Sequence, residues 1–241
     1  MLRVVLTIDC ERFISFDQGN PRWKKIEKIK GQINKLIKNF RYNKEGFELT
    51  YKTLLNEKFP STFMITGKTF KPIKGPNFIE WGYHTLNHLP LTLIAEEQLK
   101  KEVKNVYNLK SFTAPMWMIE DISNPLRIFR LLKKEKYTHC VYRGGNSGIK
   151  HFHYNTVKKS FKKEGITCVH VSNFFEGNWS NKKIKNLKED ILSNLRSEGV
   201  YLLTTHDFTH KNTKNLLEII KFLKRLEKVK KVKMFKLRDI K

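Results

Sequence analysis

The feature that most constrains this 241-residue sequence is a regular alternation between short, β-prone apolar runs and longer segments of helical period. In the longer segments, which include 94–107, 182–196 and 215–229, apolar residues recur every three or four positions. The predicted strands lie at 2–8, 61–66, 78–83, 111–114, 137–142, 167–171, 200–205 and 232–237. Strands that alternate with helices form parallel sheets, because a parallel neighbour is reached through a crossover. The sequence therefore predicts an α/β fold, a distorted (β/α) barrel of about seven to eight mostly parallel strands.

One domain, 1–241, accounts for the whole chain, because no internal repeat or low-complexity linker divides it. A lysine-rich helical insertion is expected around 20–44, where apolar residues from Ile26 to Phe40 recur at helical spacing with lysines between them. We expect this helix to pack on the barrel with a solvated basic face. A lid or a surface-binding helix is the alternative.

The charge balance is strongly basic, with 48 Lys and Arg against 23 Asp and Glu, which gives a formal net charge of +25. Such an excess favours polyanionic partners, although a lysine-rich surface without a specific partner explains it as well. No zinc finger, RNA-recognition signature or basic-aromatic repeat accompanies the charge, so nucleic acid is not expected as a partner. Electrostatic association with anionic surfaces stays open.

The cysteines and the apolar segments indicate the cellular compartment of the protein. Cys10, Cys140 and Cys168 are far apart and form no C-x-x-C pair, so neither a disulfide framework nor a zinc ribbon is predicted. The first apolar run lacks a signal-peptide layout, and no run approaches the roughly 18 residues needed to span a bilayer. We expect a soluble, cytoplasmic protein without a transmembrane segment.

Three polar clusters follow predicted strands. The first strand ends in T-I-D-C-E, where strand alternation puts Asp9 and Glu11 on one face. After the third strand comes H-T-L-N-H, where His84 and His88 have a spacing that lets two histidines on one helical turn share a cation. His206 ends the apolar run L-L-T-T-H. Each cluster alone could be a helix cap or an ordinary polar residue, but the carboxyl ends of barrel strands share one rim, where functional residues belong.

These clusters and their neighbours resemble the polysaccharide deacetylases with a NodB-type domain, carbohydrate esterase family four. The histidine cluster lies in E-W-G-Y-H-T-L-N-H-L-P-L-T, which is similar to the family's E-x-G-x-H-T-x-x-H-x-x-L-T. The other similar stretches are T-I-D-C-E (family form T-x-D-x-[DE]), P-S-T-F-M-I-T-G, F-T-A-P-M-W (family form F-R-x-P-x-G) and L-L-T-T-H-D-F. They occur in family order over nearly the whole chain. The histidine motif is the most specific and F-T-A-P-M-W is the most degraded.

The resemblance implies hydrolysis of an N-acetyl, less often O-acetyl, group on a sugar with the help of a metal ion. It implies that Glu11, His84 and His88 bind one divalent ion, for which zinc is the first choice and Co, Ni, Mn or Fe also suit. It further implies that Asp9 takes a proton from water, and that His206 protonates the departing amine.

Two departures from the family pattern bear on this interpretation. In the common T-F-D-D-G form the ligand is the residue that corresponds to Cys10, so a Cys10 thiolate is the alternative to Glu11, which strand alternation favours. Thr113 stands where the family carries an arginine that orients the catalytic aspartate and keeps it ionised. Arg143, at another predicted strand end, is the candidate to supply that charge.

Four residues are expected to contact an acetylated sugar or glycan substrate: Pro115, Trp117, Arg143 and Trp179. Trp117 is expected to wall the pocket and Trp179 to stack on a sugar ring, with core packing as the alternative for both. His210 forms a second H-x-x-x-H with His206, where a ligand role would compete with the acid role. The other histidines show no ligand spacing and are expected to be ordinary core or surface residues.

The sequence thus predicts a metal-dependent hydrolase, a sugar deacetylase. Two alternatives stay open. One is a catalytically weak or inactive protein of this fold that binds a glycan or polyanion, which Thr113 and the net charge motivate. The other is a hydrolase of another linear amide C–N bond.

Overall fold

The computed structural model describes residues 1–10, 44–89, 91–120, 124–143 and 157–241. Its strands are β1 (Leu2–Cys10), β2 (Ser61–Ile65), β3 (Ile79–Tyr83), β4 (Ser111–Phe112), β5 (His139–Tyr142), β6 (Phe161–Lys163), β7 (Ile166–Phe174), β8 (Val200–His206) and β9 (Val232–Phe235). Its helices are α2 (Lys44–Asn56), α3 (Glu96–Val103), α4 (Arg127–Lys134), α5 (Asn181–Ser193) and α6 (Lys214–Lys228). Short 3-10 turns lie at Leu91–Leu93, Pro115–Trp117, Asp207–Thr209 and Leu237–Asp239.

Seven parallel strands close into a barrel, in the order β1, β2, β3, β4, β5, β7, β8 and back to β1. The closure is visible at Thr7 of β1, which pairs with Thr62 on one side and with Thr204 on the other. The predicted parallel barrel is confirmed. The eighth predicted strand, β9, lies outside the ring, where it pairs with Leu2–Val5 of β1. The short β6 runs antiparallel to β7 and was not predicted.

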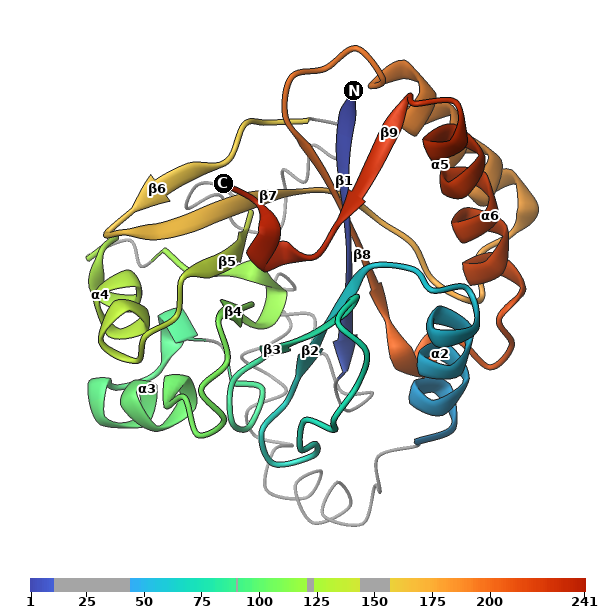
Figure 1. The fold of residues 1–241 in the computed structure, drawn as a ribbon. Coiled ribbons are helices and arrows are strands. Elements are labelled where there is room, and N and C mark those ends of the chain that lie inside the picture. The colour runs from blue at the N-terminus through green and yellow to red at the C-terminus, as the bar shows by residue number, and fades with distance from the viewer. Residues whose placement is uncertain (11–43, 90, 121–123, 144–156) are drawn as a thin grey trace, which may run out of the picture.

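Strand alternation separates an inner from an outer core. Val5, Met64 and Leu202 belong to the cluster inside the barrel, whereas Leu6 and Ile8 point outward into a cluster beneath the helices. Helices α2, α5 and α6 cover one side of the barrel and α3 and α4 cover another (Figure 1). Because strands of the ring are covered on both faces, they read as nearly continuous apolar runs.

The inner face of β3 begins with a buried carboxylate, Glu80, which is 2% exposed. It accepts hydrogen bonds from the hydroxyl groups of Thr62 (2.9 Å) and Ser111 (2.6 Å) and from the main-chain N–H of Arg238 (3.1 Å). One side chain therefore joins β2, β3, β4 and the segment after β9. Hydrogen bonds to an ionised acceptor are stronger than those between neutral groups, so this contact pins the end of the barrel.

Gly82 and His84 follow Glu80 on the same inner face, because side chains alternate along a strand. A Cβ atom on Gly82 would lie 2.4 Å from Met64 Sδ and 3.1 Å from Ser111 O. The glycine therefore makes room for Met64 in the barrel. The residues of the E-x-G-x-H pattern thus lie on one face of the strand: Glu80 binds the neighbouring strands, Gly82 leaves room for Met64, and His84 lies at the rim.

The lysine-rich helix predicted around 20–44 lies outside the described residues up to 43, and Lys44 is the first residue of α2. Helices α2 and α4 were not among the segments singled out from the sequence. Within the described part of the chain, no helix has the length and apolar character needed to cross a membrane.

We expect Glu80→Ala to lower the free energy of unfolding by about 3 kcal/mol, because two hydroxyl groups and one N–H lose a buried acceptor. Urea unfolding followed by circular dichroism measures the change. Glu48→Ala, on the exposed face of α2, is the matched control and should stay within about 0.5 kcal/mol of the parent. Equal effects of the two substitutions would contradict the anchoring role.

Candidate active site

The carboxyl ends of the seven barrel strands form one rim, and residues from several predicted motifs lie on it. Asp9 is the penultimate residue of β1, and His206 is the last residue of β8. His84, Thr113 and Arg143 directly follow β3, β4 and β5. The parallel barrel thus brings positions that are up to 197 residues apart to one edge.

Asp9 and His206 are direct neighbours in the register of β1 and β8. They share the inner face with Thr7 and Thr204, whose hydroxyl oxygens lie 2.9 Å apart one level deeper. Asp9 is only 2% exposed. Cys10 points to the opposite face and packs in the outer apolar core, which is unsuited to the alternative of a thiolate ligand on the rim.

The ring of His84 is 1% exposed and has its tautomer fixed by the main chain. Its Nδ1 lies 3.1 Å from the carbonyl oxygen of Thr113. A carbonyl can only accept, so Nδ1 carries a hydrogen, and in the neutral ring the lone pair is on Nε2. Thr113 thus contributes its backbone to the site, although its side chain lacks the charge of the family's arginine.

His84 and His88 lie close together without a helix between them. Their ring centroids are 4.6 Å apart and the ring planes meet at 62°. The spacing would also suit one helical turn, but here Thr85 (φ 65°) and His88 (φ 60°) have left-handed backbones that bend the chain. The Thr85 hydroxyl accepts from the His88 N–H at 3.0 Å and closes this bend.

A buried carboxylate on α3, Glu102, supports the bend between the two histidines. It is 0% exposed and accepts hydrogen bonds from the main-chain N–H of Asn87 at 2.8 Å, from the Asn87 side chain and from Gln98 at 3.0 Å. Its main-chain carbonyl accepts from the Leu86 N–H at 3.0 Å. Sequence reasoning missed this role. The only signal in the sequence was a glutamate on the face of the helix that carries the apolar residues Leu99 and Val103.

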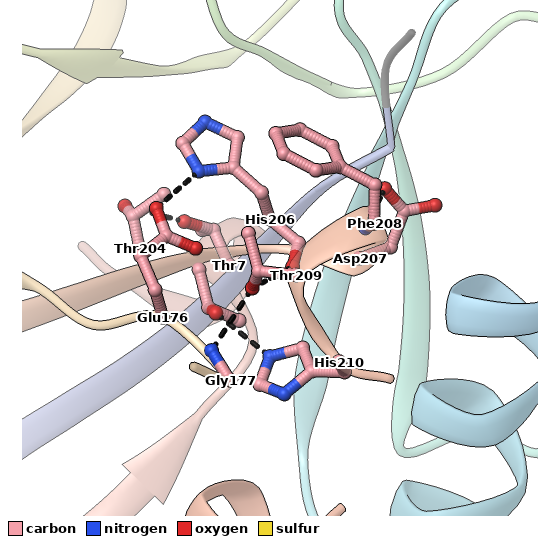
Figure 2. Close-up of polar contacts among 10 residues, drawn as sticks. Thr7, Glu176, Gly177, Thr204, His206, Asp207, Phe208, Thr209 and His210 are labelled. Carbon is pink, nitrogen blue, oxygen red and sulfur yellow. Dashed lines mark hydrogen bonds and ion pairs between the residues drawn. The ribbon is translucent and has the colours of Figure 1, made fainter. Parts of the chain in front are cut away.

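His206 is held by a second missed residue, Glu176, in the loop after β7. His206 Nδ1 donates to Glu176 Oε1 at 2.7 Å, which fixes the orientation of the ring and puts its hydrogen on Nδ1. Figure 2 shows Glu176 on one side of the His206 ring and Phe208 on the other. The pairing is an imidazole oriented by a carboxylate, an arrangement that recurs in acid–base catalysis.

The loop that carries Glu176 is locked in place by polar contacts. The Gly177 N–H donates to Thr209 Oγ1 at 3.0 Å, and that hydroxyl donates to the carbonyl of His206 at 2.9 Å. Asn215 of α6 donates to the carbonyls of Gly177 and Trp179, both at 2.9 Å. A Cβ atom on Gly177 would lie 2.4 Å from the Thr209 carbonyl oxygen, so the loop requires glycine there.

His210 lies on the other side of this segment from His206 (Figure 2). Its Nε2 is 2.8 Å from Thr205 Oγ1, and its fully buried ring packs against Phe175. Burial lowers the pKa of His210 to about 4. The ring is a neutral core group near neutral pH, an environment that does not suit the competing ligand role.

Two further histidines also have structural surroundings, as expected. His139 Nε2 donates to the carbonyl of Ile240 at 2.8 Å and fastens the end of the described chain. His170 packs against Tyr142 and Phe161, and burial lowers its pKa to about 4.

The four predicted substrate contacts occupy different environments. Pro115 is buried at the start of its 3-10 turn, and Trp117 (φ 54°) packs against the cluster inside the barrel. Trp179 packs against the outer core, with Lys183 Nζ 5.4 Å from its ring centroid, which favours the core-packing alternative. Arg143 follows β5 on the rim. Their roles toward a substrate stay predictions.

A metal ion could be held by His84 and His88 with one further ligand. The His84 contact to Thr113 leaves an imidazole nitrogen with the lone pair that a metal requires. Glu11, the third predicted ligand, lies outside the described residues. Among the residues that the structure describes, no group of three or more His, Cys, Asp or Glu side chains could hold an ion. Among the described residues, His84 and His88 therefore fit two ligands of a metal ion that needs at least one more.

Comparison with solved structures finds the same fold over nearly the full chain. A protein assigned to the polysaccharide deacetylases from Mycobacterium smegmatis is similar with a TM-score of 0.61 at 13% identity, over 99% of this chain and 88% of that one. The peptidoglycan deacetylase PdaC from Bacillus subtilis is similar with a TM-score of 0.51 at 12% identity, over 99% of this chain and 89% of that one. Puue allantoinase is similar with a TM-score of 0.60 at 9% identity, over 99% of this chain and 88% of that one.

No protein-family model matches the sequence, and no curated protein sequence matches it. The structural likeness shows that the chain has the fold of the polysaccharide deacetylases, which confirms the predicted resemblance at the level of the fold. Because the identities are low, the likeness does not define an activity.

We expect Glu102→Ala to weaken binding of Zn²⁺ by about 10- to 100-fold, because the bend between the two histidines loses its support. Isothermal titration of metal-free protein with Zn²⁺ measures this. Glu97→Ala is the matched control on α3, because Glu97 is exposed and its ion pair with Lys101 spans one turn of the same helix. Unchanged affinity in a folded Glu102→Ala protein would contradict the supporting role.

Folding stability should fall as the pH drops from 6.5 to about 4. The ordinary histidine pKa of 6.5 applies to the unfolded chain, whereas burial lowers the pKa of His210 and of His170 to about 4, so the unfolded state gains protons first. The buried His210 costs up to about 3 kcal/mol over this window, and the half-buried His170 costs less because solvent screens its charge. Urea unfolding across the pH series gives the free energy of unfolding as a function of pH. The slope of this curve should decrease by the equivalent of about one proton in His210→Gln, and likewise in His170→Gln. An unaltered slope in both variants would contradict neutral burial.

Proposed function

We propose that this protein is a metal-dependent hydrolase that removes an acetyl group from an N-acetylated or O-acetylated sugar or glycan precursor. The observation that carries the proposal is the pairing of Asp9 with a His206 that Glu176 orients, on the same rim as His84 and His88. A base, an oriented acid and a pair of imidazole ligands are the groups that hydrolysis of an unactivated amide requires.

Glu11, His84 and His88 would hold one divalent ion, with zinc as the first choice. Two imidazoles and one carboxylate leave room for water and a substrate oxygen. When bound, the ion supplies Lewis acidity that polarises a carbonyl group and lowers the pKa of a water molecule. The resemblance to the deacetylase motifs supports this assignment, together with the fixed tautomer of His84.

The proton steps fall to the pair on β1 and β8. Asp9 takes a proton from the attacking water, and its register position puts it beside His206. His206 gives a proton from Nε2 to the departing nitrogen, because an amine anion is too poor a leaving group. Glu176 accepts the Nδ1 hydrogen throughout and stabilises the imidazolium form by its charge.

A second candidate is hydrolysis of a different amide. The fold is as similar to Puue allantoinase, named for a substrate that is not a sugar, as it is to the protein from M. smegmatis. The same base, acid and metal ligands would serve both reactions, so the substrate panel must contain allantoin beside acetylated sugars. A protein that only binds glycans is disfavoured, because a binding role has no need for an acid oriented by Glu176.

The test couples metal content to acetate release from a panel of N-acetylated and O-acetylated sugars. We expect about one metal ion per chain in the parent protein, and loss of both metal and acetate release in His84→Ala. His206→Asn is the matched control at the same rim: it should keep the metal and lose about 100-fold or more in rate.

Three results would contradict this proposal in different ways. Failure of reconstituted protein to bind metal would remove the mechanism. Metal binding with turnover of allantoin alone would establish the second candidate. A His206→Asn protein as active as the parent would remove the acid role.

A further inference from the structure

A cationic surface covers the end of the barrel opposite to the rim. This end, the amino-terminal pole, comprises residues 1–3, 157–160, 196–200 and 224–233, which surround the starts of β8, β1 and β9 and the turn after α6. The Leu2 N–H donates to the carbonyl of Lys231 at 3.1 Å, and Arg3 pairs in register with Lys233 and with Val200. In Figure 1 the pole is at the top, where the start of β1 lies beside the start of β9.

The pole carries ten cationic side chains and two carboxylates. The cations are Arg3, Lys158, Lys159, Arg196, Lys224, Arg225, Lys228, Lys230, Lys231 and Lys233, and the carboxylates are Glu198 and Glu227. All of the cations except Arg3 are exposed. Lys159 binds Glu198 at 2.8 Å and Lys224 binds Glu57 at 2.8 Å, so among the described residues most of these cations have no acidic side chain as an ion-pair partner.

Neutralisation of helix ends explains only part of this charge. Cations in the last turn of α6 are favourable near the carbonyl end of the helix dipole. Lys230, Lys231 and Lys233 lie beyond the helix, and Lys233 is the direct cross-strand neighbour of Arg3. Like charges opposite each other on strands destabilise the fold. An anionic surface would relieve this repulsion.

Exposed apolar side chains stand among these cations. Val229 is 61% exposed between Lys228 and Lys230, and Met1 is 71% exposed beside the Leu2–Lys231 contact. Apolar side chains next to lysines suit the boundary between headgroups and acyl chains. A nucleic acid would instead favour stacking aromatics, and no aromatic residue is among the large apolar side chains that are exposed in the described ranges. Seven of the ten cations are lysines, whose point charges require no fixed geometry.

We propose that the amino-terminal pole binds the surface of membranes that contain anionic phospholipids. The lysines contact the headgroups, and Val229 and Met1 enter the headgroup region. β1 runs from the pole to the rim, about 30 Å for nine residues, so the docked protein holds Asp9 and His206 away from the membrane. The proposal does not depend on the deacetylase activity.

The test is cosedimentation with phosphatidylcholine vesicles, with and without phosphatidylserine, over a salt series. We expect binding only with phosphatidylserine. The triple variant K228E/K230E/K231E should bind about 100-fold more weakly, and Val229→Ser several-fold more weakly. The matched control is K52E/K182E/K214E, which makes the same charge change at exposed lysines on α2, α5 and α6 away from the pole and should keep most of the binding. Circular dichroism checks that each variant is folded.

Absence of binding to phosphatidylserine vesicles, or equal losses in the two triple variants, would overturn the proposal. Heparin and duplex DNA serve as competing probes in the same assay. If the parent protein bound either of them and no vesicle, and K228E/K230E/K231E lost that binding, the pole would be a site for soluble polyanions and the membrane assignment would be wrong.

Discussion

The structure depends on the way β1 pairs with three other strands. One edge of β1 pairs with β8 from Arg3 to Asp9, and the other is divided between β9, along Leu2–Val5, and β2, along Thr7–Cys10. The pairing with both β2 and β8 closes the ring, and the ring brings the ends of its strands to one rim. Asp9 and His206 are neighbours because of this register. A slip of one residue would turn Asp9 into the outer core and Cys10 toward the rim.

The inner face of the barrel mixes polar and apolar levels, in contrast with the outer face. On β3 the carboxylate of Glu80 binds hydroxyl groups from two neighbouring strands at one end, Gly82 leaves room for Met64 in the middle, and His84 stands at the rim. On β1 the inner residue before Asp9 is Thr7, whose hydroxyl group contacts that of Thr204. The motif that resembles the deacetylases thus includes residues that stabilise the barrel as well as those at its rim. The presence of this motif is therefore explained by its role in the fold as directly as by a role in catalysis.

Local pattern predicted the fold and the rim positions well, because strand alternation and parallel connection are local and topological rules. The four-residue spacing of His84 and His88 allowed them to lie close together on a helical turn, whereas a bend with left-handed Thr85 and His88 brings them together. The two supporting carboxylates could not be found in this way. Glu176 is 30 positions from His206 and Glu102 is 15 from Asn87, so neither contact leaves a periodic signal. The sequence pattern thus predicts the side chains at the rim more readily than the side chains that orient them.

Two of the rim histidines, His84 and His206, differ in what each Nδ1 hydrogen contacts. The His84 hydrogen is donated to a neutral main-chain carbonyl, that of Thr113, and the His206 hydrogen to the carboxylate of Glu176. A carbonyl fixes the tautomer of the neutral ring, with the lone pair on Nε2, which suits a metal ligand. A carboxylate fixes the same tautomer and adds a full negative charge that stabilises the imidazolium form, which suits a proton donor. In the proposed mechanism, the acceptor of the Nδ1 hydrogen thus suits one histidine to metal binding and the other to proton donation.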